Sequence, residues 1–152
     1  MFWGCNRIHL TEEGKNYFVC LLCGVLFFTG WWMMIDVLAV NSQVISATKI
    51  YHIPGLASTA SFLIVNAIST RYIEIYYCVY APTCKNIALA RSIMYIGLVL
   101  GFGSLFAATY ILIHDFLLSA VESYTPGVFI FLQNFLIFSS NMILKFFYRT
   151  DY

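Results

Sequence analysis

Four long uncharged runs constrain this chain more than any other feature of its sequence. No charged or histidine residue interrupts the stretches 16–35, 53–70, 92–113 and 123–144. An α-helix needs about 20 residues to cross about 30 Å of hydrocarbon, and each run is close to that length. We therefore expect an all-α, polytopic membrane protein, folded as a single domain that is a bundle of four transmembrane helices.

The bulk composition agrees with a membrane protein. Mean hydropathy is +0.82, 61% of the residues are hydrophobic and 10% are charged, whereas a soluble domain carries about 25% charged residues. Pro54 and Pro126 stand near two of the expected helix starts, which suits proline in a first helical turn. The expected crossings are residues 16–40, 54–70, 91–113 and 125–145.

Lysine and arginine are distributed unequally between the two sides of this topology. Lys49 is the one basic residue on the side opposite the chain ends. The remaining basic residues are Arg7, Lys15, Arg71, Lys85, Arg91, Lys145 and Arg149. Positive residues are retained in the cytoplasm, so we expect both termini in the cytosol.

The five cysteines all lie on the cytosolic side of the predicted topology or in the cytosolic half of the first crossing. Thiols are kept reduced in the cytosol, so we expect no structural disulfide. Cys20 and Cys23 have C-x-x-C spacing, but inside an apolar helix ordinary packing is favoured over a metal or redox site. Palmitoylation of Cys5, Cys78 or Cys84 stays open.

Small residues recur on one face of the third crossing. Gly97, Gly101, Ser104 and Ala108 have the spacing i, i+4, i+7 and i+11, which lets another backbone approach closely in lipid. This face could pack within the bundle or against another subunit. The first crossing has a weaker version of the pattern in Gly24 and Gly30.

Some polar residues lie at membrane depth, where an unpaired polar group is costly. We expect them to hydrogen-bond between helices, with Asn66 near Ser140 and Asn141. Asp36 has three open interpretations: an interface residue in contact with water, an inward structural contact, or a proton or ion site. The candidate intramembrane polar residues are Asp36, Asn66, Gln133 and Asn134.

No catalytic pattern is present in the sequence. There is no G-x-S-x-G, no paired histidine motif and no phosphate-binding glycine loop. His9, His52 and His114 lie on different predicted elements, and no acidic cluster could hold a metal. We expect no enzymatic activity, no cofactor, no metal and no nucleic-acid partner.

Several sequence segments resemble the transmembrane protein 50 family, also designated UPF0220. The most specific is the run from Gly24 to Trp32 followed by Ile35-Asp36. The others are Asn66-Ala67, Gly101 to Leu105, Pro126-Gly127, Gln133-Asn134, Lys145-Phe146 and Arg149-Thr150. The chain departs from the family pattern before the first crossing, where it lacks a Cys-x-x-Cys, and in its tyrosine-rich middle loop.

The resemblance implies a membrane-trafficking role. A fungal relative is a vacuolar protein-sorting factor that pairs with a second small four-pass protein, of the leptin-receptor-overlapping-transcript type. We therefore expect a non-catalytic subunit of a membrane complex in the endoplasmic reticulum, Golgi or endosomes. It would support protein transport from late endosome to vacuole or lysosome. The alternative is an accessory subunit of a lipid-transfer assembly in the endoplasmic reticulum, with membrane lipids as its partners.

Overall fold

The computed structural model describes the backbone of residues 3–40, 49–68, 81–118 and 124–148. Side chains are described from residue 14 in the first range, 51 in the second and 84 in the third. No strand occurs in these ranges, so the expected all-α class is confirmed. The elements are α1 (Trp3–Val40), the 3-10 turn η1 (Lys49–His52), α3 (Ile53–Ala67), α5 (Ala81–Ile111), the π-helical turn η2 (Leu112–Leu117) and α6 (Thr125–Phe147).

In the part of the chain that the structure describes, three helical segments are long and apolar enough to cross a membrane, which indicates a membrane protein. They are Gly14–Val40, Cys84–Leu117 and Thr125–Phe147. α3 is also apolar but has only 15 residues. Its rise is about 22 Å, against roughly 30 Å of hydrocarbon. Four crossings therefore remain a proposal.

The helix boundaries differ from the expected crossings. α1 and α5 begin at Trp3 and Ala81, ahead of the expected starts at 16 and 91. Charge limits the part of a helix that can lie in hydrocarbon, but it does not interrupt the backbone hydrogen bonds that form the helix. Pro54 and Pro126 lie in the first turns of α3 and α6, as expected.

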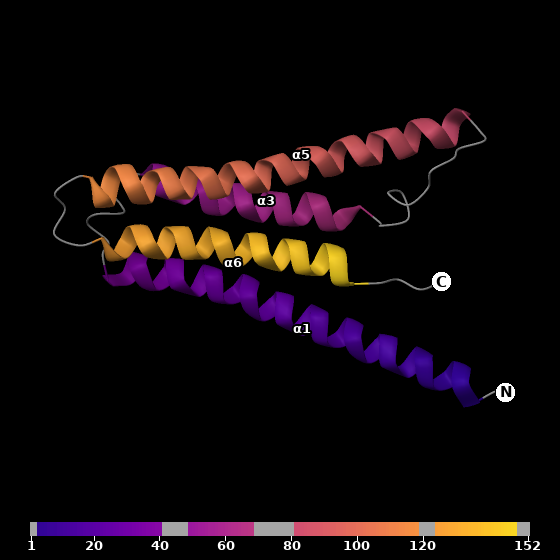
Figure 1. Cartoon of the computed structure of the whole chain (residues 1–152). Helices are drawn as coiled ribbons and strands as arrows, with labels where there is room; N and C mark the ends of the chain where they lie inside the picture. Colours follow the sequence, from indigo (N-terminus) through magenta and orange to yellow (C-terminus); the bar gives the residue numbers. More distant parts are fainter. Residues whose placement is uncertain (1–2, 41–48, 69–80, 119–123, 149–152) are drawn as a thin grey trace.

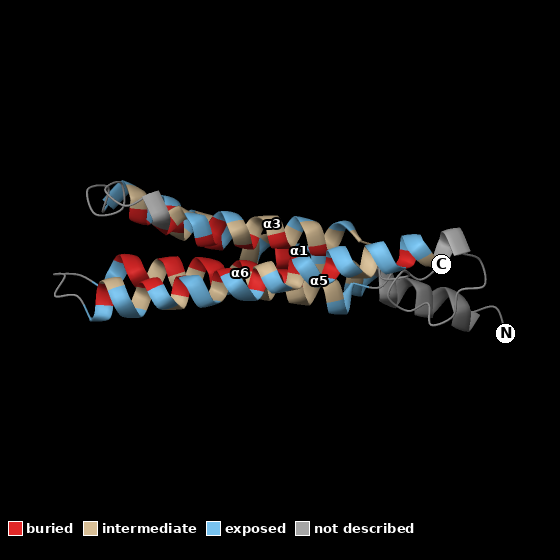
Figure 2. Ribbon diagram, turned by 90° about the horizontal axis from the view of Figure 1, so that it is seen from above, coloured by how far each residue is buried: buried red, intermediate tan, exposed pale blue. Residues whose placement is uncertain are grey.

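The four α-helices run side by side with alternating direction (Figure 1). α1 begins and α6 ends at the same end of the bundle, where α1 and α5 diverge from each other (Figure 1). α6 contacts α1, α3 and α5, and α3 also contacts α5. Buried and exposed residues alternate along the helices (Figure 2), so the covered faces lie between the helices and the outer faces stay open.

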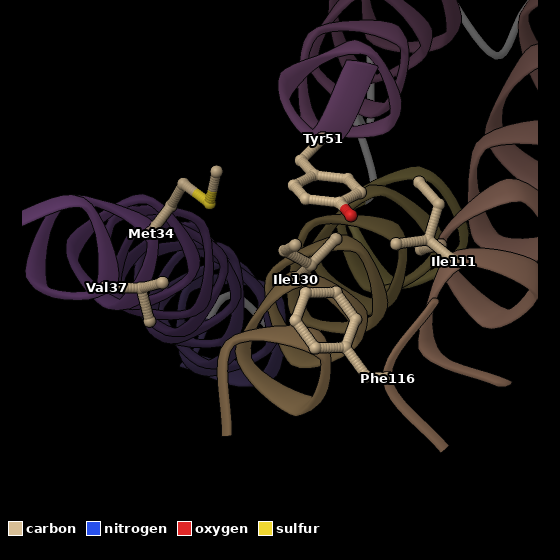
Figure 3. Packing of buried hydrophobic residues seen from close by; sticks show 7 residues of the cluster. Met34, Val37, Tyr51, Ile111, Phe116 and Ile130 are labelled. Atoms are coloured by element: carbon tan, nitrogen blue, oxygen red, sulfur yellow. The ribbon is translucent and has the colours of Figure 1, made fainter. Parts of the chain in front are cut away.

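An apolar cluster closes the other end of the bundle, where α1 ends and α6 begins. Its side chains converge from α1, η1, α5, η2 and α6 (Figure 3). Gly127 makes room for the Phe116 ring, since a Cβ at Gly127 would lie 2.6 Å from a ring carbon. The cluster consists of Met34, Val37, Tyr51, Ala108, Ile111, Phe116 and Ile130.

Cysteine pairing corrects one sequence-based expectation. Cys84 is disulfide-bonded, and its partner is not among the cysteines whose side chains are described; Cys20 and Cys23 are free thiols. The expectation of no disulfide is therefore wrong at Cys84. It followed from the redox chemistry of the cytosol, and it contained no information about which thiols lie near each other.

Candidate functional site

Polar side chains gather between α3, α5 and α6, where they are covered by the surrounding helices. We call this set the polar seam. All of its members except Asn66 are buried. The polar seam consists of Ser58, Ser61, Asn66, Ser104, Asn134 and Asn141.

One half of the polar seam is a chain of three hydrogen bonds. Asn66 Nδ2 donates to Oδ1 of Asn141 at 2.9 Å. Asn141 Nδ2 donates to Oγ of Ser61 at 3.2 Å. Ser61 Oγ donates to the carbonyl of Gly97 at 2.6 Å. The chain crosses from α3 to α6, returns to α3 and ends on α5, so it fixes all three helices in one register.

The other half of the polar seam surrounds a serine pair. Ser58 Oγ donates to Oδ1 of Asn134 at 2.7 Å, and it lies 2.6 Å from Oγ of Ser104. Asn134 Nδ2 in turn donates to the carbonyl of Ile130 at 2.9 Å. Side chains of this kind can approach so closely only where the backbones of α3 and α5 are near each other.

Glycine on α5 provides that close approach. A Cβ at Gly101 would lie 2.6 Å from Ser61 Oγ, and one at Gly97 would lie 2.8 Å from Val65 Cγ2. Ser104 and Ala108 continue the same buried face. The small-residue face predicted from the sequence is therefore turned into the bundle, toward α3 and α6.

α1 is joined to α6 by a separate set of contacts. Ser140 Oγ donates to the carbonyl of Cys23 at 2.9 Å. A Cβ at Gly30 would lie 3.1 Å from the Gln133 carbonyl oxygen. Gly24, in contrast, has open space where a side chain would be. The two predicted glycines of α1 thus have different surroundings.

Lys145 on α6 caps the end of α3. Its Nζ donates to the carbonyls of Val65 and Ile68 at 3.0 and 2.6 Å. The last carbonyls of a helix lack partners inside the helix and favour a nearby cation. Lys145 therefore serves as an inter-helix contact and as a cap for a helix that has no side-chain cap at its beginning.

The polar seam satisfies its own hydrogen bonds. Among the described residues, every side-chain nitrogen or oxygen sealed from the surface has a partner. The same part of the chain contains no cluster of metal-ligating side chains. A closed network of amides and hydroxyls holds helices in register but offers no reactive group, so its chemistry is that of a packing device.

Comparison with known protein families shows which family this chain belongs to. A model of the uncharacterised protein family UPF0220 matches residues 3–151. This chain belongs to the UPF0220 family. The resemblance seen in the first-crossing sequence is confirmed. No solved structure matches this UPF0220 chain.

The four candidate intramembrane polar residues of this UPF0220 protein differ in burial and in hydrogen bonding. Asn66 and Asn134 belong to the polar seam, and the Asn66–Asn141 contact was expected from helix depth. Gln133 is buried beside Gly55. Asp36 is exposed, and within the described residues its side chain makes no hydrogen bond or ion pair. Of the three interpretations of Asp36, the inward structural contact is therefore not seen among the described residues.

Sequence reasoning missed three partners of the polar groups in this UPF0220 protein. Ser58 and Ser61 follow Gly55 at intervals of three residues, a small-residue pattern that marks a packing face of α3. The sequence showed Lys145 as one of the basic residues that indicate orientation. It did not show that the Lys145 ammonium group lies beside the last carbonyls of α3. Their roles depend on which helix lies opposite.

Proposed function

We propose that this protein is a non-catalytic subunit of a membrane complex that supports endosomal and secretory-pathway protein trafficking. The proposal includes transport from late endosome to vacuole or lysosome and residence in the endoplasmic reticulum, Golgi or endosomes. Its support is the resemblance of the sequence to the transmembrane protein 50 family, whose fungal relative sorts vacuolar proteins together with a second four-pass protein. That second protein is the partner we propose.

The structural observation that favours a complex is the uncovered face of α1. Gly24 lies on this helix with open space beside it, and a small residue on an uncovered apolar face permits close approach of another helix. α1 has its extensive contacts with α6, so its opposite side is available. Within residues 14–40, whose side chains are described, the large exposed apolar residues of α1 are Tyr17, Phe18, Leu21, Val25, Phe28, Trp32, Ile35 and Val40.

We further propose four crossings with both termini in the cytosol. The unequal distribution of lysine and arginine supports this orientation, and α1 begins where α6 ends (Figure 1). The disulfide at Cys84 opposes it, because thiols are kept reduced in the cytosol. Glycosylation acceptor tags at each terminus test the orientation: modification of either tag would contradict cytosolic termini.

Co-purification in mild detergent tests the complex. The expected result is recovery of a second small polytopic protein with the wild-type chain. Gly24→Leu should reduce that recovery, and Gly14→Leu is the matched control, since Gly14 also has open space but adjoins Lys15 at the edge of the apolar run. Recovery of a lone chain, together with normal cargo sorting after deletion, would defeat the proposal.

A lipid-handling role is the second candidate, as an accessory subunit of a lipid-transfer assembly in the endoplasmic reticulum. The broad exposed apolar surface of α5 favours it, since this surface includes Val99, Phe102 and Phe106. Ordered acyl chains along α5 and α6 in a structure of the purified assembly would support this role. A protein-filled interface without lipid there would exclude it.

A further inference from the structure

A pocket lies apart from the polar seam, at the junction of α1, η1, α3 and α6. Its volume is about 240 Å³, and its lining residues are Trp31, Met34, His52, Leu56 and Gln133. A single water needs only about 10–15 Å³ by the corresponding measure. The pocket therefore has room for a substantial part of an organic molecule.

Gln133 is the unusual residue of this pocket. It is 1% exposed, and its amide lies against Gly55, where a Cβ would be 2.8 Å from Nε2. The Gln133 side chain makes no hydrogen bond to a described residue. Among the described residues, every side-chain polar atom that is fully sealed has a partner, so the Gln133 amide is not fully sealed. The amide is therefore almost completely covered, its small accessible part belongs to the lining of the pocket, and Gly55 leaves the space in which the amide lies.

Apart from Gln133 and His52, the lining of the pocket is apolar, and the pocket opens at membrane depth. Met34 is buried, and it belongs to the candidate span Gly14–Val40. Leu56 is 59% exposed and marks the side on which the pocket meets the surroundings. The neighbouring side chains of Trp32 and Ile53 are also exposed and apolar. In a membrane, the medium beside such an opening is lipid.

We propose that this pocket binds the ester-bearing end of a diacyl membrane lipid, with the Gln133 amide donating a hydrogen bond to an ester carbonyl. A plain hydrocarbon chain would leave that amide unsatisfied, which is costly away from water. An ester carbonyl is an acceptor that has no donor of its own. Small-molecule sites combine apolar walls with a few placed polar groups in the same way.

The pocket size determines how much of the lipid enters. Pockets that enclose a whole drug-sized ligand measure about 300–1,000 Å³, so a pocket of about 240 Å³ holds only the region around the ester. The acyl chains then lie outside, along the apolar outer surfaces of α1 and α3. His52, the last residue of η1 and the N-cap of α3, supplies a second polar group to the pocket. This inference goes beyond both proposed functions, because a lipid held here can be a fixed component of the fold.

Photo-cross-linking of the full-length chain tests the pocket. The protein is reconstituted in phosphatidylcholine vesicles that contain a diazirine close to the ester of one acyl chain, and labelled peptides are mapped. Labelling is expected at residues 31–34 and 52–56. Leu56→Trp should fill the opening and lower this labelling at least fivefold. Leu63→Trp is the matched control, since Leu63 lies two turns along α3 and is equally exposed at 63%.

A second measurement isolates the hydrogen bond. Unlabelled diacyl lipid should compete about fivefold better than its dialkyl ether analogue, which lacks the carbonyl; a hydrogen bond of ordinary strength gives a factor of that size. Gln133→Leu should abolish the preference. Equal competition by the two lipids in the wild type would overturn the proposal. Labelling spread evenly over all exposed apolar faces, or unchanged by Leu56→Trp, would show bulk lipid contact only and would also overturn it.

Discussion

Asn66 on α3 and Asn141 on α6 are 75 positions apart, yet their side-chain amides hydrogen-bond at 2.9 Å. The same Asn141 amide donates to Ser61, so one residue of α6 holds two positions of α3. In an apolar medium no water competes for these amide groups. Either helix alone would leave them without a hydrogen-bond partner, so their pairing fixes the two helices in register.

Asn141→Ala should lower the free energy of unfolding by about 1–2 kcal/mol, because it breaks one buried and one partly buried hydrogen bond at once. Detergent-solubilised protein unfolded in a denaturant series, with helicity followed by circular dichroism, measures the change. Ser139→Ala is the neighbouring control on α6, since Ser139 is only partly buried. If the control lost as much free energy of unfolding as Asn141→Ala, the hydrogen bonds of Asn141 would not be the cause of the loss.

Gly101→Val should destabilise the α3–α5 contact by about 2 kcal/mol, as expected for overpacking. A Cβ at this position lies 2.6 Å from Ser61 Oγ, so Ser61 must rotate away and lose its bond to Gly97. Gly103→Val is the control because Gly103 has open space beside it. Thermal unfolding in detergent should separate the two variants, and equal melting temperatures would contradict the packing of this face.

Gly30→Leu should loosen α1 from α6, since a side chain there meets the Gln133 carbonyl at 3.1 Å and Ile137 at 3.4 Å. We expect faster hydrogen–deuterium exchange in residues 26–34 and a loss of about 1–3 kcal/mol. Gly24→Leu, on the same helix with nothing within 4 Å, should leave exchange in the isolated chain unchanged. The prediction fails if Gly24→Leu has the larger effect.

Lys145→Met should fray the end of α3, because it removes both hydrogen bonds to the carbonyls of Val65 and Ile68. Hydrogen bonds to a charged group contribute about 1.5–3 kcal/mol, less where water reaches them, so we expect a loss of about 1 kcal/mol. Amide exchange at residues 64–68 measures it. Lys145→Arg should retain part of the protection, and Lys85→Met, at an exposed lysine, should have no effect there.

The helices could be read from the sequence, whereas their boundaries could not. Uncharged runs located all four α-helices, and Pro54 and Pro126 marked two starts. The runs failed to place Trp3 and Ala81 as helix beginnings, because charged side chains are compatible with helical hydrogen bonds outside the hydrocarbon. The uncharged run also overestimated the length of α3, because the run continues to residue 70 whereas the helix ends at Ala67.

The site residues show the same division. Gly97 and Gly101 were identifiable from spacing alone because a helix places i and i+4 on one face. Gly24 and Gly30 looked equivalent in sequence, yet only Gly30 meets another helix. Neither the exposure of Asp36 nor the burial of Gln133 could be read from the sequence, since both are polar residues within largely apolar segments.

By itself, the sequence determined the medium, the helical class and the family, because hydropathy and motif identity are properties of residues taken along the chain. Only the tertiary structure decided which polar groups meet, which glycine is covered and where a pocket remains. Those outcomes depend on which faces of α3 and α6 lie opposite each other, and the hydrogen bonds that fix this register join residues 75 to 80 positions apart.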